Sequence, residues 1–167
     1  MAGLGMCLVR QLVGPWHDGG VSHYPLPSAP EGHVSLFVDL SPSGEPVFEV
    51  LPAARLDDDR YELLGSPALA LGCAAGDIIR RSPDGRFVVE LKGGKYCVQA
   101  AAMGPLPDAG LQALSNLAQR FKGIAEWPLD GRFAVLTLPE STSLPELESA
   151  LDAWANTIPD AQWWFGN

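Results

Sequence analysis

Few residues of this chain combine the type and the spacing that chemistry requires. The three histidines, His17, His23 and His33, lie six and ten positions apart, in or beside a segment rich in proline and glycine. Because a zinc site needs such ligands at helix or hairpin spacing with a further donor nearby, they predict no metal site. The three cysteines are widely spaced and include no Cys-x-x-Cys pair, a pattern typical of free, mostly buried thiols in a reducing compartment.

Motifs for nucleophilic catalysis and for phosphate binding are also missing from the sequence. It contains no Gly-x-Ser-x-Gly elbow and no Gly-x-x-x-x-Gly-Lys loop, and Gly93-Gly94-Lys95 has the form of a hairpin turn. Catalysis would require some of the twenty acids to converge in a pocket that the sequence does not reveal. We therefore expect no catalytic residue, no metal and no cofactor, and the protein is predicted not to be an enzyme.

The charge of the chain is acidic and unevenly distributed. Twenty Asp and Glu face eleven Lys and Arg, for a net charge of -9. Residues 31–62 hold eight acids against two arginines, residues 123–167 hold seven acids against Arg132, and residues 80–95 between them are locally basic. Such a protein is poorly suited to hold nucleic acid or an anionic membrane, and well suited to a basic protein partner.

The most concentrated charge is the run Asp57, Asp58 and Asp59. Two interpretations of this run remain open. It is either a solvated turn between two strands or a projection that enters a cationic pocket of a partner.

A second group of candidate contacts belongs to the C-terminal acidic block. It comprises Glu126, Asp130, Glu146, Glu148 and Asp152. Glu146 and Glu148 follow a predicted helix start, where the helix dipole already favours negative charge. Glu148 and Asp152 are four residues apart with no cation between them, a repulsion of roughly 0.2–0.5 kcal/mol that a cationic partner would relieve.

The C-terminal run Trp163-Trp164-Phe165 concentrates aromatic residues. In a strand, Trp163 and Phe165 share one side and pack under the helices with Trp154, while Trp164 faces the other side. That second side is either an exposed aromatic anchor for a partner or is covered within the fold.

Short β-strands separated by turns are predicted for the middle of the chain, after a loosely ordered lead-in at residues 1–32. The predicted strands are Val34–Leu40, Val47–Leu51, Arg60–Leu64, Asp77–Arg81, Phe87–Leu91 and Tyr96–Ala102. Their number and size indicate a small antiparallel sheet or partial barrel over residues 33–95. The small apolar residues Ala68–Ala75 are interpreted as a helical turn across one end of it.

From residue 96 onward the pattern changes to β-α-β-β-α-β. One helix opens at Pro107-Asp108 and ends near Gly123, and a hairpin turn stands at Asp130-Gly131. Ser143 and Glu146 have the spacing of a capping box that opens the second helix. The predicted fold class is therefore α+β, with residues 96–167 forming a ferredoxin-like half that has two helices on one face of a four-stranded sheet.

No apolar run approaches the roughly 18–20 residues needed to cross a bilayer. Residues 1–10 lack the basic start and long apolar core of a signal peptide. We expect a cytoplasmic protein.

The segment Tyr61–Arg80 resembles a known protein family. Its Tyr-x-Leu, the later Pro67 and the run Ala-Ala-Gly-Asp-Ile-Ile at 74–79 resemble a family of uncharacterised small bacterial domains. Some members of that family look like the immunity half of bacterial toxin–immunity pairs. The similarity covers about residues 33–166 and supplies no catalytic residue, because Gly76-Asp77 has the form of a turn that starts a strand.

The resemblance implies an immunity protein that binds a cognate bacterial toxin, with a secreted nuclease as the favoured class. An acidic surface would cover the basic active-site cleft of such a toxin. The candidate contacts are the two acidic groups and Trp164. The alternative is a non-catalytic small-molecule binding or regulatory module, in which the basic residues at 80–95 hold an anion.

Overall fold

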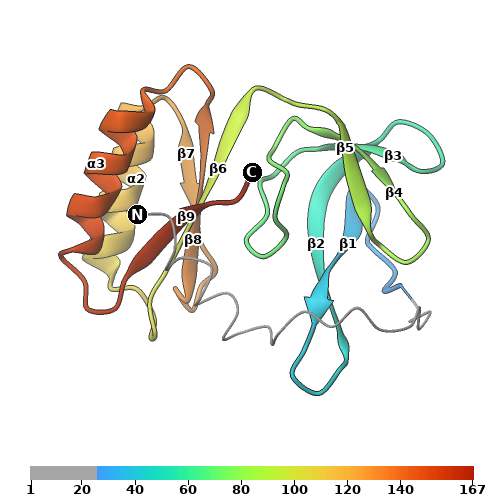
Figure 1. Cartoon of the computed structure of the whole chain (residues 1–167), viewed down its shortest axis with the longest axis horizontal. Helices are drawn as coiled ribbons and strands as arrows, with labels where there is room; N and C mark the ends of the chain where they lie inside the picture. The colour runs from blue at the N-terminus through green and yellow to red at the C-terminus, as the bar shows by residue number, and fades with distance from the viewer. Residues whose placement is uncertain (1–25) are drawn as a thin grey trace.

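The computed structural model describes residues 26–167, which form an α+β structure of two antiparallel sheets and two helices (Figure 1). The lead-in predicted at residues 1–32 falls mostly outside the described residues. The first sheet has the order β1-β2-β3-β4-β5. Its strands are β1 (His33–Leu40), β2 (Pro46–Arg55), β3 (Arg60–Leu63), β4 (Ile78–Arg81) and β5 (Phe87–Leu91). These strands confirm the predicted β pattern to within a few residues at their ends.

The first sheet curls but does not close into a barrel. Its edge strand β1 approaches the turn before the other edge strand, β5, where the amide of Phe37 donates to the carbonyl of Gly85, 2.9 Å away. Gly85 stands in the Asp-Gly turn with a φ of 87°, and a Cβ there would lie 3.0 Å from the Phe37 nitrogen. Glycine is therefore required both for the turn and for the close approach of β1.

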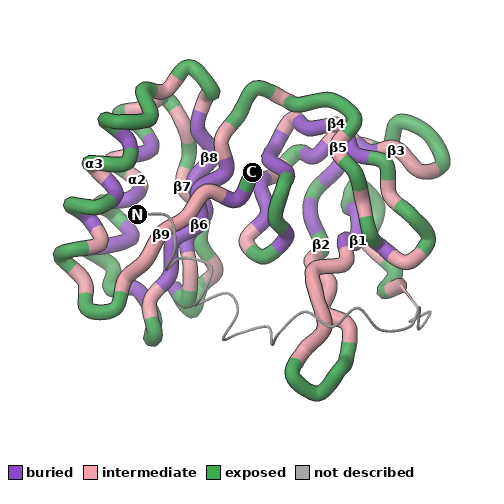
Figure 2. Tube along the Cα trace, in the orientation of Figure 1, coloured by how far each residue is buried: buried purple, intermediate pink, exposed green. Residues whose placement is uncertain are grey.

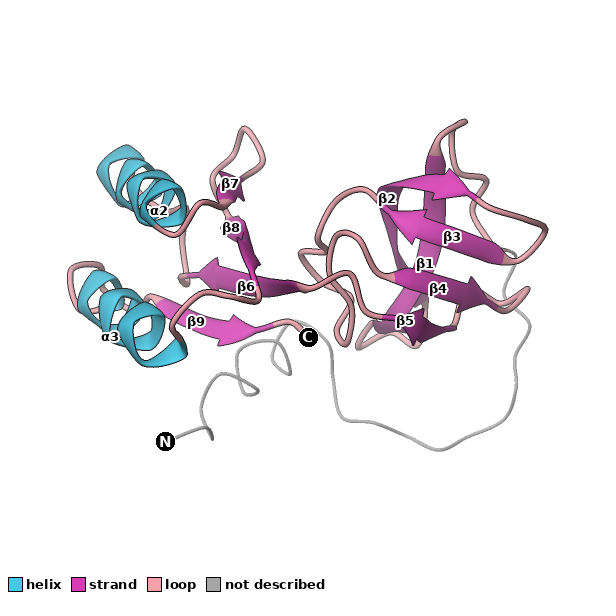
Figure 3. Cartoon of the chain, turned by 90° about the horizontal axis from the view of Figure 1, so that it is seen from above, coloured by secondary structure: helices cyan, strands magenta, loops and turns pink. Residues whose placement is uncertain are grey.

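The second sheet has the order β7-β8-β6-β9, with every neighbouring pair antiparallel. Its strands are β6 (Lys95–Ala101), β7 (Ile124–Glu126), β8 (Phe133–Pro139) and β9 (Gln162–Phe165), and the helices are α2 (Asp108–Arg120) and α3 (Leu144–Ala155). Both helices cover the same face of this sheet, α2 beside β7 and α3 beside β9 (Figure 3). The core between them is aliphatic and is completed by Trp154.

The other face of the second sheet packs against the loop that joins β3 to β4. Thr137 donates a hydrogen bond of 2.7 Å to the Ser66 hydroxyl, and the Gln99 amide donates one of 2.9 Å to the Pro67 carbonyl. All four residues are buried. This loop therefore joins the two halves of the molecule through polar as well as apolar contacts.

The helical turn predicted for Ala68–Ala75 is wrong, because this segment is an irregular loop. The carboxylate of Glu49 on β2 accepts three successive loop amides, from Ala68 at 2.7 Å, Leu69 at 3.0 Å and Ala70 at 2.8 Å. A distant side chain thus satisfies the donors that a helix would have used internally.

The Gly76-Asp77 turn is fixed by a buried carboxylate. Asp77 is fully buried and accepts the amides of Ala74 at 3.0 Å and Gly93 at 2.7 Å. Lys92 reaches the same carboxylate at 3.4 Å. A Cβ on Gly93 would lie 2.2 Å from the carbonyl carbon of Gly76, so the two loops touch backbone to backbone. In this structure the motif joins the β3–β4 loop to the start of β6.

Helix α3 begins after Ser143 as predicted, but the capping box is not formed. Ser143 makes no side-chain cap hydrogen bond, and its carbonyl accepts the amide of Leu147 at 3.0 Å. Pro145 occupies the first turn, where its missing N–H costs nothing. The carboxylate of Glu146 is therefore left free of the helix end.

Candidate partner-binding surface

The Asp57–Asp59 run forms the turn between β2 and β3, and each of its carboxylates faces an arginine. Asp57 lies 3.4 Å from Arg60, Asp58 lies 3.1 Å from Arg55, and Asp59 lies 2.8 Å from Arg80. Asp57 also accepts the backbone amide of Arg60 at 3.1 Å. Partial desolvation raises the pKa of Asp57, but hydrogen bonds from the backbone and Arg60 outweigh it and leave the pKa lowered.

The basic residues of β3 and β4 continue this network to Glu90 on β5. Register places Arg60 opposite Arg80, and Glu90 bridges them at 2.7 and 2.6 Å. Hydrogen bonds from Arg60 and then Arg80 lower the pKa of Glu90, and the hydrogen bond to Glu90 is the main cause that raises the pKa of each arginine. The acidic turn therefore has its charge compensated by Arg55, Arg60 and Arg80. Glu90 shares in the compensation of Arg60 and Arg80.

The same pairing weakens the case for an anion site on residues 80–95. Arg80, Arg86 and Lys92 each form an ion pair with an acid of the chain, and the guanidinium of Arg81 lies 5.4 Å from the centre of the Tyr61 ring. An anionic ligand at Arg80, Arg86 or Lys92 would have to displace carboxylates that are already in place, whereas Arg81 and the exposed Lys95 form no ion pair among the described residues.

The acids of α3 behave differently. Glu146, Glu148 and Asp152 are exposed, and none forms an ion pair within the described part of the chain. The sequence contains no lysine or arginine after Arg132. Among the described residues, the side-chain hydrogen bond of this group comes from the indole N–H of Trp163, which donates to the Asp152 carboxylate at 3.0 Å. We call these three residues, with the exposed Glu140, the α3 acidic surface. Figure 2 shows that much of α3 is exposed along its outer side.

Glu126 and Asp130 do not belong to the α3 acidic surface. They lie on β7 and in the following turn, at the edge of the second sheet that α2 covers. Asp130 is paired with Arg132 at 2.6 Å, whereas Glu126 is exposed without an ion pair among the described residues. The structure thus divides the C-terminal group of candidate residues into two separate surfaces.

Exposed apolar residues surround Glu126 and were missed from the sequence. Ile124 is 56% exposed, Trp127 is 39% exposed and Leu129 is fully exposed in the β7–β8 turn. We call these three residues with Glu126 the β7 tip. The run Trp-Pro-Leu-Asp-Gly could have predicted this exposure, because a tight turn between two strands leaves no room to bury the residues at its apex.

Trp164 is not an exposed anchor. It is half-buried on the face of β9 that points away from the helices, and its indole N–H donates to the side-chain oxygen of buried Gln99. Trp163 and Phe165 pack against the helical core on the opposite face. The alternation predicted for this strand is present, and the second face is largely covered within the fold.

Within residues 26–167, no three His, Cys, Asp or Glu side chains gather in a way that could hold a metal ion. Neither helix described has the length and apolar character to span a bilayer. The buried Cys73 and Cys97 are free thiols, and burial raises the pKa of each to about 12.

Comparison with known proteins identifies a family but no activity. The model of a family described as "Domain of unknown function (DUF4265)" matches residues 49–159. No curated protein matches the chain. A crystal structure of a hypothetical protein from Neisseria gonorrhoeae is similar with a TM-score of 0.60 and 13% identity, over 84% of this chain and 96% of that one. At this identity the similarity concerns the fold alone.

Proposed function

The chain belongs to the DUF4265 family, and we propose that it is a non-catalytic immunity protein. It binds a cognate bacterial toxin, with a secreted nuclease as the favoured class, and covers the basic cleft of that toxin with the α3 acidic surface. The partner is a protein and not nucleic acid or membrane, and the complex forms in the cytoplasm. The resemblance at Tyr61–Arg80 supplies the class of partner, and the distribution of charge supplies the face.

The observation that carries the proposal is the unpaired charge of α3. The acids at Asp57–Asp59 already have arginine partners, whereas Glu146, Glu148 and Asp152 have none among the described residues. Unpaired exposed charges of one sign raise the association rate with an oppositely charged surface and repel nucleic acid. A nuclease must present cations to phosphate, so its cleft is complementary to such a surface.

The β7 tip is the supporting apolar contact. Protein interfaces draw most of their affinity from a few desolvated aromatic and aliphatic residues, while charged rims set rate and orientation. Trp127 and Leu129 supply such residues beside Glu126. In the proposal, one partner engages the α3 acidic surface and also contacts the β7 tip.

We further propose that the second half is ferredoxin-like. The strand order β7-β8-β6-β9, the antiparallel pairing throughout and the two helices on one face support this assignment.

The test is co-expression of the full chain with the product of the neighbouring gene, followed by co-purification and measurement of Kd. The triple variant Glu146→Gln, Glu148→Gln and Asp152→Asn should raise Kd about 3- to 150-fold, since each exposed charge contributes about 0.2–1 kcal/mol. The difference in Kd between this variant and the wild-type protein should become smaller as the salt concentration is raised.

The matched control neutralises Asp57, Asp58 and Asp59 instead, which removes the same number of carboxylates. It should leave Kd within about twofold, because those carboxylates are already engaged with arginines. If no stable complex forms, or if the control weakens binding more than the α3 variant does, the proposal is wrong.

A further inference from the structure

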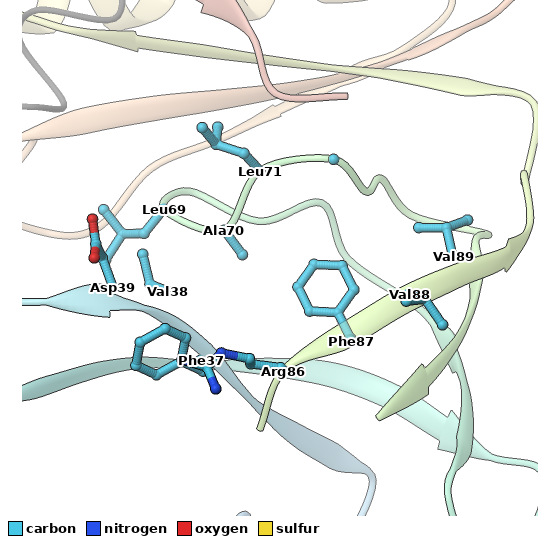
Figure 4. Close-up of a pocket in the computed structure, with 11 residues that line it drawn as sticks. Phe37, Val38, Asp39, Leu69, Ala70, Leu71, Arg86, Phe87, Val88 and Val89 are labelled. Carbon is cyan, nitrogen blue, oxygen red and sulfur yellow. The ribbon is translucent and has the colours of Figure 1, made fainter. Parts of the chain in front are cut away.

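A cleft separates the two edges of the first sheet beyond the point where β1 approaches the turn before β5. Its volume is about 500 Å³. One wall is β1 at Phe37 and Val38, the opposite wall is β5 at Phe87–Val89, and the loop at Leu69–Gly72 closes one side (Figure 4). Strands β1 and β5 run in the same direction, because four antiparallel pairings separate them.

The lining of this cleft is mostly apolar although the cleft is open. Leu71 is 46% exposed and Val88 is 61% exposed, and both side chains border the opening. Phe37, Phe87 and Val89 are only partly buried. Apolar side chains grouped around an opening in this way are typical of a binding site.

The walls also expose strand edges. In the described part of the chain, strand β1 pairs with β2 alone and β5 pairs with β4 alone, and the Phe37–Gly85 hydrogen bond links β1 to the turn that precedes β5. Because each of these strands has a strand neighbour on one side only among the described residues, its other edge offers backbone N–H and C=O groups for pairing. An extended polypeptide provides donors and acceptors at the matching spacing, which is how a strand is added to an open sheet edge.

The charges at the cleft differ in how they are compensated. Arg86 is paired with Asp84 at 2.9 Å, and its guanidinium lies 5.1 Å from the centre of the Phe37 ring. The carboxylate of Asp39 accepts its neighbouring amide from Leu40 at 2.7 Å and has no cation within the described residues. The uncompensated charge at the cleft is therefore negative, so a complementary ligand carries a cation there.

We propose that this cleft binds an extended segment of a partner protein. The segment lies between β1 and β5, antiparallel to both, with apolar side chains toward Val38, Phe87 and Val89, which pack against the core of the first sheet, and a lysine or arginine beside Asp39. Apolar side chains alternate along it, because only every second residue of a strand faces one side. This contact is distinct from the α3 acidic surface and does not depend on the function proposed for it.

The test is an NMR titration of the labelled full chain with a blocked eight-residue peptide, Lys-Val-Thr-Val-Thr-Val-Thr-Val. Backbone amides of Phe37–Leu40 and Phe87–Leu91 should shift, and the amides of α3 should not. Asp39→Asn should weaken binding about two- to fivefold, and Leu71→Ser should weaken it further. The α3 triple variant should bind the peptide as wild type does.

Two control peptides decide the mode of binding. One replaces the threonines by proline, which removes backbone donors while keeping the valines, and the other replaces lysine by glutamate. Both should bind at least fivefold more weakly. Equal binding of the proline peptide would identify a pocket for apolar molecules and overturn the proposal. Absence of shifts in the cleft at about 1 mM peptide would overturn it as well.

Discussion

Replacing Asp77 tests whether the Gly-Asp motif is architectural. The carboxylate is fully buried and accepts the amides of Ala74 at 3.0 Å and Gly93 at 2.7 Å. In Asp77→Ala both amides lose their acceptor, and each buried donor left unsatisfied costs about 1–3 kcal/mol. The free energy of unfolding should therefore fall by about 2–6 kcal/mol, a large part of the 5–15 kcal/mol typical of such a domain.

Asp77→Asn separates the two hydrogen bonds. The amide oxygen can still accept from Gly93, but an NH₂ group would face the Ala74 amide, so one donor is lost. We expect a loss of about 1–3 kcal/mol. The control is Asp58→Ala, whose carboxylate is fully exposed and paired with Arg55, and it should change stability by less than about 1 kcal/mol.

Urea unfolding followed by tryptophan fluorescence measures these differences, with the slope of the transition checked for a change in the folded state. A loss below about 1 kcal/mol in Asp77→Ala, or wild-type stability in Asp77→Asn, would refute the structural role. If instead Asp77→Asn kept its stability and lost partner binding, the motif would be functional and its assignment as a turn would be wrong.

Three other outcomes follow from packing and charge. Gly93→Ala should lower the unfolding free energy by at least about 2 kcal/mol in urea, because its Cβ would lie 2.2 Å from backbone across the loop. Cys73 and Cys97 should react with a thiol reagent at pH 8 only after denaturation, since burial raises their pKa to about 12. Glu90, whose folded pKa is lowered from 4.5, contributes stability that is present above that value and lost as pH falls through the lowered pKa. Glu90→Gln should therefore flatten the decline in urea midpoint between about pH 5 and pH 3, and an unchanged slope would contradict this.

Local patterns predicted the elements well, because their causes lie within a few residues. Asp-Gly turns, a 3.6-residue period after Pro107 and alternating apolar residues determined most strands and both helices. The segment Ala68–Ala75 was misjudged because its conformation depends on Glu49, nineteen or more residues away. No local rule indicates that a carboxylate from another strand will accept its amides.

The candidate site was predicted less well than the fold. The sequence identified both acidic groups, but it could not show that Arg80 lies opposite Asp59 or that the ends of α3 lack a compensating cation. The exposure of Trp127 and the covering of Trp164 also depend on contacts between distant segments.

By itself the sequence determined the α+β class, the order of elements, the acidic surplus and the absence of catalytic sequence motifs. All of these depend on composition and on short-range spacing. Only the tertiary structure decided which charges remain free and where a cleft opens. Strand register brought β3, β4 and β5 together so that Arg60 and Arg80 neutralise acids from the turn and from Glu90. The Coulomb energy of a charged pair depends on the distance between the charges in space, and the opening of the cleft depends on the curvature of the whole sheet. Neither can be obtained from positions along the chain.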